Sequence, residues 1–346
     1  MTWRMPAETE PHERTWMAWP SGGYTLGDTA FEAELARTTW AAVANAVVDH
    51  EPVSMVVPPS AVADARRLLS ASVEVHVHPL DDAWYRDTGP TFVLDEAGRL
   101  GAVDWVFNGW GAQAWARWEL DAQAARVAIA ASGAEPVSSP LVNEGGGVHT
   151  DGHGTVLVTR TVQLDPGRNP GWDEAAVEAE LARTVGARRV IWLPRGLTRD
   201  SREFGTRGHV DLVATFTGPG EVLVHVQHDP AHPDHPVTEE LVGLLRAATD
   251  ADGRSLRVTE LPAPRGLTDA EGFVDHSYVN HYVANGVVVA CAFDDPADAP
   301  AREILAGAYP GREVVAVDAR PLFARGGGIH CITQQQPARP APQEVR

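Results

Sequence analysis

The order of strand-like and helix-like patterns is the feature that most constrains what this chain can fold into. Alternation of one strand with one helix would predict a doubly wound parallel sheet, whereas here two or three strands accompany each helix. Hairpins and helices therefore belong to the same units, and about five ββαβ-like units fit the 346 residues. No stretch of linker-like composition separates these units. The element order thus predicts an α/β fold made of repeated ββαβ units.

The individual elements follow from hydrophobic spacing and turn residues. Apolar residues at three- and four-residue steps predict a helix over 31–48, with Asp28 or Thr29 as its N-cap. Further helices are predicted at 60–69, 119–131, 172–185, 237–248 and 298–309. Strands are predicted at 53–57, 73–77, 91–94, 100–107, 155–159, 189–193, 210–217, 222–226, 278–283 and 287–293. Residues 3–20 show neither period, and we expect them to be ordered but irregular.

Net charge and cysteine count exclude several classes of protein. With 28 Lys and Arg against 47 Asp and Glu, the formal net charge is −19. This charge disfavours binding to nucleic acid or anionic membranes and weakly favours a small cation as the substrate. Solubility alone is the alternative explanation of this acidity. Two cysteines cannot form a disulfide framework. The N-terminal residues lack the apolar core of a signal peptide, and no apolar run approaches the roughly 20 residues of a membrane span. We expect a cytoplasmic protein.

The stretch GGGIHC at residues 326–331 contains the more distinctive of the two cysteines. Three glycines permit positive φ and let a ligand approach the backbone closely. Cys331 follows them outside any apolar run, and we interpret it as a candidate nucleophile. Taken alone, a small buried packing residue is the alternative for Cys331. Cys291 lies within VVVACAF and is predicted to be such a packing residue.

Two acidic residues stand in loops that end in glycine. Asp87 lies in WYRDTGP, beside Trp84 and Arg86, where a rigid carboxylate would match the fork of a guanidinium group. Glu144 lies in NEGGG, directly before a glycine run. Each pattern, taken alone, is equally typical of a turn with a solvated carboxylate.

A histidine and an aspartate follow in GHVD at residues 208–211. If 210–217 is a strand, the two-residue spacing puts His209 and Asp211 on the same face, where they could serve one site. His209 would then transfer protons near its ordinary pKa. A histidine buried in the core is the alternative.

Eight motifs in this order resemble the agmatine deiminase family, which is related to bacterial peptidylarginine deiminases within the guanidine-modifying pentein superfamily. They are EPHERTWMAWP ending at Pro20, WYRDTGP at 84–90, NGWG at 108–111, EGG at 144–146, RNP at 168–170, GHVD at 208–211, SYVN at 277–280 and GGGIHCITQQ at 326–335. The resemblance implies a pentein α/β-propeller of five ββαβ modules around a central site. It implies one catalytic domain over 1–337, followed by a flexible tail at 338–346.

The resemblance also implies a role for each motif residue. Asp87 and Asp211 would hold the substrate guanidinium, Glu144 would neighbour both substrate and histidine, His209 would be the general acid and base, and Cys331 the nucleophile. Trp84 and Gly328 would contribute to substrate binding. The expected reaction converts agmatine to N-carbamoylputrescine and ammonia through a thiouronium intermediate, as in putrescine biosynthesis. Neither a metal nor another cofactor is expected.

The segment before GHVD departs from the family pattern and leaves the substrate tail open. Gly205 and Arg207 stand where the family has acidic or amide residues, although Thr206 keeps its place. If Arg207 faces the mouth of the site, arginine, a guanidino acid or peptidyl arginine would be favoured. If it pairs with Glu203 or Asp200 instead, agmatine would still bind, and either of these acids could hold its amine.

Several other features carry alternatives. His225, His228, His232 and His235 imitate a zinc-site spacing, but we interpret them as solvent-exposed turn residues. The glycine runs match neither dinucleotide nor P-loop motifs. Trp16, Trp19 and Trp110 fit the core as well as they fit the site. Amidino transfer, a binding protein without activity, and assembly into a homo-oligomer all stay open.

Overall fold

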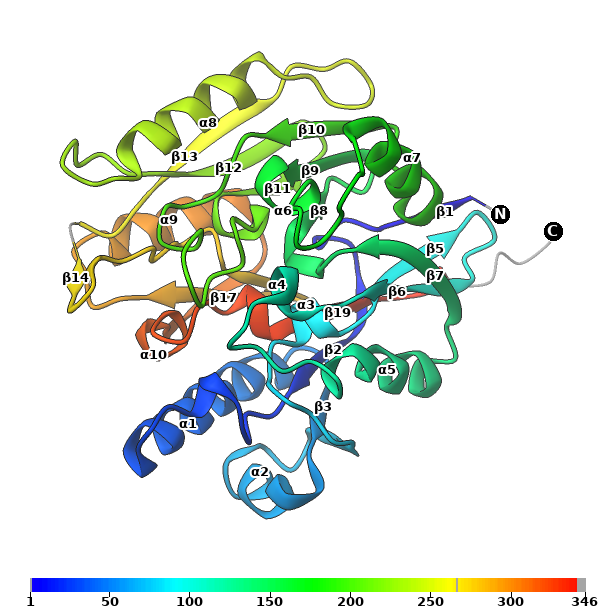
Figure 1. The fold of residues 1–346 in the computed structure, drawn as a ribbon, viewed down its shortest axis with the longest axis vertical. Coiled ribbons are helices and arrows are strands. Elements are labelled where there is room, and N and C mark those ends of the chain that lie inside the picture. Colours follow the sequence, from blue (N-terminus) through cyan, green and yellow to red (C-terminus); the bar gives the residue numbers. More distant parts are fainter. Residues whose placement is uncertain (1, 266, 341–346) are drawn as a thin grey trace.

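The computed structural model describes residues 2–265 and 267–340, and it is a mixed α/β structure (Figure 1). Within these ranges it contains five sheets of three or four strands and a two-stranded ribbon. Each of the five larger sheets contains an antiparallel pair followed by a parallel pair whose strands are joined through a helix. The repeated ββαβ order that the sequence predicts is therefore present.

The first of these sheets joins the two ends of the chain. Its order is β19 (Thr333–Pro337), β2 (His12–Ala18), β3 (Val53–Val57) and β4 (Glu74–Val77). Helix α1 (Ala30–Val48) connects β2 to β3, and α2 (Val62–Leu68) connects β3 to β4. The α1 N-cap is Thr29, whose side chain accepts a hydrogen bond from the Glu32 backbone within a capping box.

The prediction that residues 3–20 are irregular was wrong, because β2 lies inside this segment. Residues 15–18 of β2 are buried, and the strand is paired on both sides, by β19 and β3. A strand buried on both faces does not alternate between apolar and polar residues, so it lacks the period by which strands are detected.

The other four large sheets follow along the chain. The second sheet contains β1 (Trp3–Arg4), β5 (Thr91–Asp95), β6 (Leu100–Val106) and β7 (Glu135–Val142), and α5 (Ala125–Ser132) lies between β6 and β7 in the chain. In each sheet that follows, the helices named likewise connect its strands. The third contains β8 (Val148–Thr150), β9 (Thr155–Thr159), α6 (Arg160–Gln163), α7 (Glu174–Val185) and β10 (Arg189–Leu193). The fourth contains β11 (Ala214–Gly218), β12 (Glu221–Val226), α8 (His235–Ala247) and β13 (Arg257–Pro262). The fifth contains β16 (Tyr282–Ala284), β17 (Val287–Ala292), α9 (Asp298–Ala308) and β18 (Glu313–Asp318).

The remaining elements are short. The two-stranded ribbon is β14 (Thr268–Asp269) and β15 (Gly272–Phe273), and α10 (Arg320–Phe323) follows β18. Short helical turns are α3 (Tyr85–Thr88), α4 (Gly109–Ala112), η1 (Tyr24–Leu26), η2 (Pro59–Ala61), η3 (Asp121–Gln123), η4 (Gly145–Gly147), η5 (Val210–Leu212) and η6 (His330–Ile332). Turn α3 contacts both η4 and η6, and η4 contacts η5. These four turns therefore bring together segments that lie far apart in the sequence.

Two predicted elements differ from the structure near these turns. The strand predicted at 210–217 begins only at Ala214, because residues 210–212 form η5. The helix predicted at 119–131 divides into η3 and α5. Beyond β19, the Ala338 backbone donates to the Pro11 carbonyl, and the flexible tail expected at 338–346 extends into residues 341–346, outside the described part.

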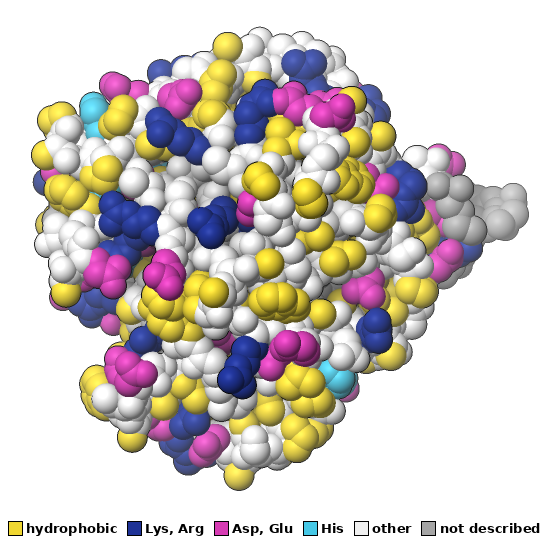
Figure 2. Space-filling model, viewed as in Figure 1, with side chains coloured by type: hydrophobic (Ala, Val, Ile, Leu, Met, Phe, Trp, Pro, Cys, Tyr) yellow, Lys and Arg dark blue, Asp and Glu magenta, His cyan; other side chains and the backbone are white. Residues whose placement is uncertain are grey.

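On the face drawn in Figure 2, basic and acidic side chains are interspersed among apolar ones. This face therefore has no broad surface of one sign, although the chain carries a formal net charge of −19. None of the helices in the described ranges has the length and apolar character needed to cross a membrane.

Burial along α8 provides a direct test of this packing. Leu241 is 0% exposed where α8 covers β12 and β13, whereas Leu244 on the same helix is 42% exposed. We expect Leu241→Ala to lower the free energy of unfolding by about 2–5 kcal/mol. The matched change Leu244→Ala should stay within about 0.5 kcal/mol. Urea denaturation measures both, and similar losses would contradict this packing of α8.

Candidate active site

Five sequence-predicted residues meet in the interior, each carried by or next to one of the short turns. Asp87 lies in α3, Glu144 precedes η4, His209 precedes η5, Asp211 lies in η5 and Cys331 in η6. None of these five is more than 3% exposed. Because the turns contact one another, they gather a thiol, an imidazole and three carboxylates from distant parts of the chain.

Glu144 and His209 form the first part of the site. Glu144 Oε2 lies 3.1 Å from His209 Nε2, and both carboxylate oxygens accept hydrogen bonds from Arg168 Nε at 3.0 and 3.1 Å. Burial would raise the pKa of Glu144, but Arg168 and then His209 lower it below its usual value. Glu144 is therefore a fixed negative charge behind the imidazole.

His209 is held in its charged form by its surroundings. Burial lowers the pKa of His209, but Asp87 and Glu144 outweigh this effect and raise it to about 9. Nε2 faces Glu144, whereas Nδ1 lies 3.8 Å from Asp87 Oδ1 and has no hydrogen-bond partner among the described residues. Nδ1 is therefore the ring nitrogen that is available to a ligand.

Asp87 receives only neutral hydrogen-bond donors. Trp110 Nε1 donates to Oδ2 at 2.9 Å, and the Gly146 backbone N–H donates to Oδ1 at 3.1 Å. Burial raises the pKa of Asp87 to about 6, against the opposing attraction of His209. A cation bound beside Asp87 would therefore be strongly favoured.

Asp211 is oriented from behind by a buried ion network. Its Oδ2 lies 2.7 Å from His330 Nδ1, and His330 Nε2 lies 2.8 Å from Glu8 Oε2. Each ring nitrogen of His330 thus contacts one carboxylate. Burial and Arg86 act to lower the pKa of His330, but the two carboxylates outweigh them and raise it. Asp211 Oδ1 is left without a partner in the described part of the chain.

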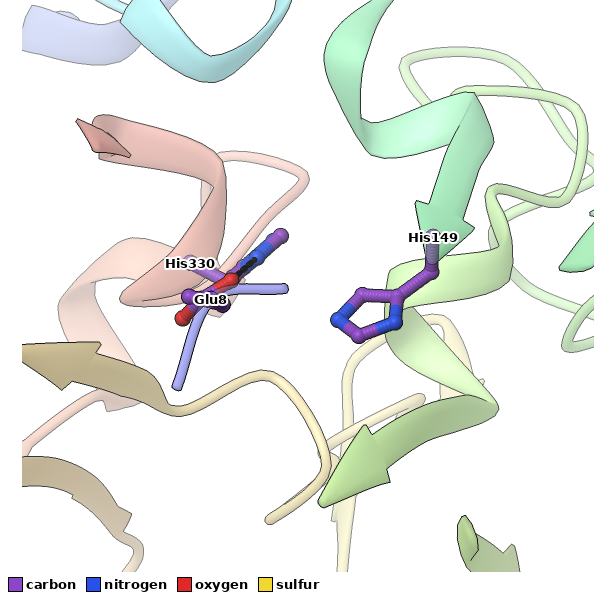
Figure 3. Close-up of side chains that lie close together, drawn as sticks. All are labelled: Glu8, His149 and His330. Atoms are coloured by element: carbon purple, nitrogen blue, oxygen red, sulfur yellow. Dashed lines mark hydrogen bonds and ion pairs between the residues drawn. The ribbon is translucent and has the colours of Figure 1, made fainter. Parts of the chain in front are cut away.

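Glu8, His149 and His330 lie close enough together to be considered as a metal site (Figure 3). Their nitrogens are already engaged, however: His149 Nδ1 accepts from the Phe216 backbone at 3.2 Å, and Nε2 lies 2.9 Å from Thr215 Oγ1. Burial lowers the pKa of His149 to about 4, so its ring is neutral. We therefore interpret the cluster as a hydrogen-bonded support for Asp211.

Cys331 faces the two aspartates. Its Sγ lies 3.8 Å from Asp211 Oδ2 and 3.3 Å from Asn280 Nδ2. Burial, and after it Asp211 and Asp87, raises the pKa of Cys331 well above its ordinary value. Without a bound cation the side chain is therefore a thiol at neutral pH.

The polar atoms of the site converge on one point. A Cβ built on Gly146 would lie 2.5 Å from His209 Nδ1, 3.0 Å from Asp87 Oδ1 and 3.1 Å from Asp211 Oδ2. A glycine is required there, because any side chain would displace these groups. Unpartnered Asp211 Oδ1, the two aspartates and a facing thiol suit a planar cation with several N–H donors.

A cavity beside Cys331 is walled by aromatic side chains. They are Trp84, Trp110, Trp115 and Phe204. The Trp110 and Trp115 rings stack with centroids 5.5 Å apart. A Cβ on Gly327 would lie 2.8 Å from the Trp84 ring and 3.0 Å from Cys331 Sγ, so this glycine leaves room between them. Such walls suit an apolar chain attached to a cation.

None of the three charged residues considered for the substrate tail lines this cavity. Both Asp200 oxygens accept hydrogen bonds within the loop, from Thr206 and from the His209 backbone, so Asp200 supports the loop conformation. Arg207 is half-buried and does not line the cavity, and its side chain has no hydrogen-bond or ion-pair partner among the described residues. Glu203 lines a second cavity that shares Phe204 with the first.

Two sequence interpretations of histidines were wrong. His209 and Asp211 do not share a strand face: they meet because η5 turns the chain there. The sequence pattern of η5 is too short for a period to reveal it. His225 and His232 are buried and not exposed in turns, and burial lowers the pKa of His225 to about 3.

Several residues of the site were missed by sequence reasoning. Arg168 and Asn280 stand in the RNP and SYVN motifs, to which no role was given. Glu8 lies in a segment interpreted as irregular, and His330 was passed over as the neighbour of Cys331. The signal that could have found them is a polar residue set inside an otherwise buried stretch, which requires a partner.

Fold and site together define a class: mixed α/β proteins in which a buried thiol, an imidazole and three carboxylates are gathered beside an aromatic-walled cavity. The model of the Porphyromonas-type peptidyl-arginine deiminase family matches residues 4–337. The chain therefore belongs to this family.

Its relatives are similar over nearly their whole length. The chain is 57% identical to the "Putative agmatine deiminase" of Streptomyces coelicolor, over 97% of this chain and 99% of that protein. It is 39% identical to the agmatine deiminase of Ectopseudomonas mendocina, over 96% of this chain and 95% of the relative. The solved agmatine deiminase of Enterococcus faecalis superposes with a TM-score of 0.91 at 32% identity, covering 98% of this chain and 97% of that one. These findings confirm the resemblance predicted from the motifs.

The charge of His209 can be tested by titration. We expect an imidazole pKa of about 9, and a fall of about one unit or more in Glu144→Gln, which removes the nearest hydrogen-bonded carboxylate. Because this pKa exceeds the ordinary 6.5, protonated His209 stabilises the fold fully below pH 6.5, and the contribution is lost as the pH rises through about 9. NMR titration of the ring, assigned with His209→Gln, measures the pKa.

Glu51→Gln is the matched control for this titration. Glu51 is a buried carboxylate that contacts a different histidine, His12, at 3.2 Å. Its loss should leave the His209 pKa unchanged. A His209 pKa near 6.5 in the wild type, or equal shifts in both variants, would contradict the proposed role of Glu144.

Proposed function

We propose that this protein is an agmatine deiminase, a hydrolase that converts agmatine and water to N-carbamoylputrescine and ammonia in putrescine biosynthesis. The single observation that carries the proposal is the convergence of Asp87, Asp211 and His209 around Gly146, with Cys331 Sγ 3.8 Å from Asp211 Oδ2. Agmatine deiminases that cover nearly the whole chain support the choice of substrate. In this proposal the enzyme acts in the cytoplasm on a small cation and needs no metal.

The first step is capture of the guanidinium. Asp87 and Asp211 accept its N–H groups, with Asp211 Oδ1 as the acceptor that has no partner in the described residues. The bound cation attracts the thiolate and offsets its repulsion by the carboxylates, so the pKa of Cys331 falls. The thiol proton passes to solvent water, because His209 is already protonated. Trp84 and the backbone at Gly328 border the bound group.

The second step is exchange of ammonia for sulfur. The Cys331 thiolate forms a C–S bond to the guanidinium carbon, and one C–N bond lengthens as His209 gives its Nδ1 proton to the departing nitrogen. Ammonia leaves and an S-alkylthiouronium remains. Neutral His209 then takes a proton from water, whose oxygen attacks the same carbon. The C–S bond breaks, the sulfur leaves as a thiolate, and this thiolate takes the proton of the attached hydroxyl, which restores the thiol and leaves the neutral ureido product. Glu144 keeps the imidazole oriented throughout.

The arrangement of the sheets fits this central position of the site. We infer that the five large sheets are five ββαβ modules in a pseudo-fivefold propeller, and that residues 1–337 form one catalytic domain. The inference is supported by the common order of one antiparallel and one parallel pair in each sheet. It is supported too by the likeness to the agmatine deiminase of Enterococcus faecalis.

The proposed reaction is tested with the purified protein and agmatine. We expect release of ammonia together with the ureido product, and a loss of at least about 10³-fold in kcat for Cys331→Ala, because no other group can form the intermediate. Cys291→Ser is the matched control. Cys291 Sγ donates to the Asn280 carbonyl at 3.2 Å, and a serine hydroxyl can keep this contact, so the variant should keep its activity. Equal rates for Cys331→Ala and the wild type would contradict the proposal.

The same assay separates the alternative substrates and reactions. Arginine, a guanidino acid and a peptidyl arginine are offered beside agmatine, and a higher kcat/KM for any of them would assign the enzyme to that substrate. Glycine or ornithine is added as an acceptor for amidino transfer. Formation of the ureido product alone would exclude a transferase, and absence of every product would point to a binding protein.

The pH dependence of kcat/KM follows from two pKa values. Asp87, with a pKa of about 6, must be ionised to bind the cation, and His209, with a pKa of about 9, must be protonated to release ammonia. The profile should therefore be bell-shaped, falling below about pH 6 and above about pH 9. A rate that keeps rising past pH 9 would contradict His209 as the proton donor, and stopped assays across pH 5–10 measure it.

A further inference from the structure

Asn280 lies at the centre of the proposed catalytic groups although it carries no charge. It is 0% exposed and sits in the loop before β16. Its side-chain amide contacts the His330 backbone, the Asp211 backbone and the sulfur of Cys331. It therefore contacts three segments of the site at once.

Two of these contacts fix which way the amide points. Oδ1 accepts a hydrogen bond from the His330 backbone N–H at 3.1 Å, and Nδ2 donates to the Asp211 carbonyl at 3.2 Å. Rotating the amide by half a turn would set a donor against the His330 N–H and an acceptor against the Asp211 carbonyl. The hydrogen-bond network therefore admits one orientation.

In that orientation both amide atoms lie near the sulfur: Nδ2 can donate to Sγ, and Oδ1, at 3.5 Å, can accept from the thiol while the sulfur keeps its proton. Nδ2 lies 3.3 Å from Cys331 Sγ, and Asp211 Oδ2 lies 3.8 Å from it. No arginine or histidine side chain in the described ranges hydrogen-bonds to Sγ. The groups that favour the ionised sulfur are the Gly328 backbone and the Asn280 side chain. Asn280 is thus the side-chain donor to the proposed nucleophile.

The glycine run leaves the space that Asn280 occupies. A Cβ built on Gly328 would lie 2.5 Å from Asn280 Oδ1 and 2.6 Å from the Phe323 ring. Neither neighbour could move away easily, because Oδ1 is tied to the His330 backbone and Phe323 packs in the core. Gly328 and Asn280 therefore depend on each other, which links the SYVN motif to the GGGIHC stretch.

We propose that Asn280 is a catalytic residue that donates a hydrogen bond from Nδ2 to the Cys331 thiolate and so supports its formation and its attack on the substrate. The donor is neutral, so it stabilises the thiolate without competing with the substrate cation for Asp87 and Asp211. After the C–S bond has formed, the sulfur no longer carries the charge and the hydrogen bond weakens; it is restored when the thiolate leaves. This assignment rests on the proposed function, in which Cys331 is the nucleophile.

The test measures the sulfur directly, without substrate. The rate of alkylation of Cys331 by iodoacetamide is followed from pH 6 to 10.5, and the labelled cysteine is identified by peptide mass spectrometry. Loss of a hydrogen bond to a charged group should lower the rate at pH 8 by about tenfold to hundredfold in Asn280→Ala. The inflection of the profile should move to higher pH. In the agmatine assay, kcat should fall far more than KM rises.

Ser277→Ala is the matched control within the same loop. Ser277 is also 0% exposed, and its hydroxyl donates to the Leu212 carbonyl without contacting Cys331. Its alkylation profile should match the wild type. Asn280→Asp keeps the shape and the acceptor for the His330 N–H but replaces the donor with a carboxylate. The lost donor and the added charge should both slow alkylation, so this variant should be slower than Asn280→Ala.

The outcomes separate this inference from the proposed function. Wild-type alkylation profiles in Asn280→Ala and Asn280→Asp would overturn the assignment, as would an equal slowing in Ser277→Ala. If alkylation slows only in the Asn280 variants, while the wild type does not act on agmatine, the hydrogen bond stands and the choice of substrate fails.

Discussion

Buried negative charge is the constraint on which the rest of the site depends. Three carboxylates, those of Asp87, Glu144 and Asp211, are almost fully buried. A buried carboxylate without a compensating charge is strongly unfavourable. Two of them are compensated permanently, Glu144 by Arg168 and Asp211 by the His330 ring between two carboxylates. Asp87 has only the neutral donors Trp110 and Gly146, together with His209 at 3.8 Å. Asp87 is therefore the least compensated of the three carboxylates, and a substrate guanidinium would lie beside it.

The same imbalance governs the thiol. While the site is empty, Asp211 and Asp87 hold the pKa of Cys331 high, so the sulfur keeps its proton and reacts slowly with anything that enters. A cation between the two aspartates reverses the field at the sulfur. In the proposed function, binding and activation are thus one electrostatic event, and a neutral analogue of the substrate would bind without generating the nucleophile.

The sequence was sufficient for the residues that act directly, but not for those that hold them. Cys331, His209, Asp87, Glu144 and Asp211 could be predicted because each stands in a short motif. The supporting contacts join residues far apart: Arg168 to Glu144 across 24 positions, and His330 to Glu8 across 322. No local pattern encodes such a pair, because each partner alone looks like an ordinary surface charge. Two local elements were also predicted wrongly because they have no visible period. Strand β2 does not alternate between apolar and polar residues, and η5 is too short to show a helical period.

The pairing of the C-terminal strand β19 with the N-terminal strand β2 connects the overall fold to the charges of the site. Strand β19 follows Cys331 directly and pairs with β2 from the other end of the chain, with Thr333 opposite Met17. This pairing fixes the ends of both segments, so that Glu8, ahead of β2, reaches His330, just before Cys331. If β19 separated from β2, Glu8 would no longer hold the imidazolium, and Asp211 would lose the charge that keeps it ionised and oriented. The N-terminal segment is therefore part of the site electrostatically, although none of its residues lines the cavity beside Cys331.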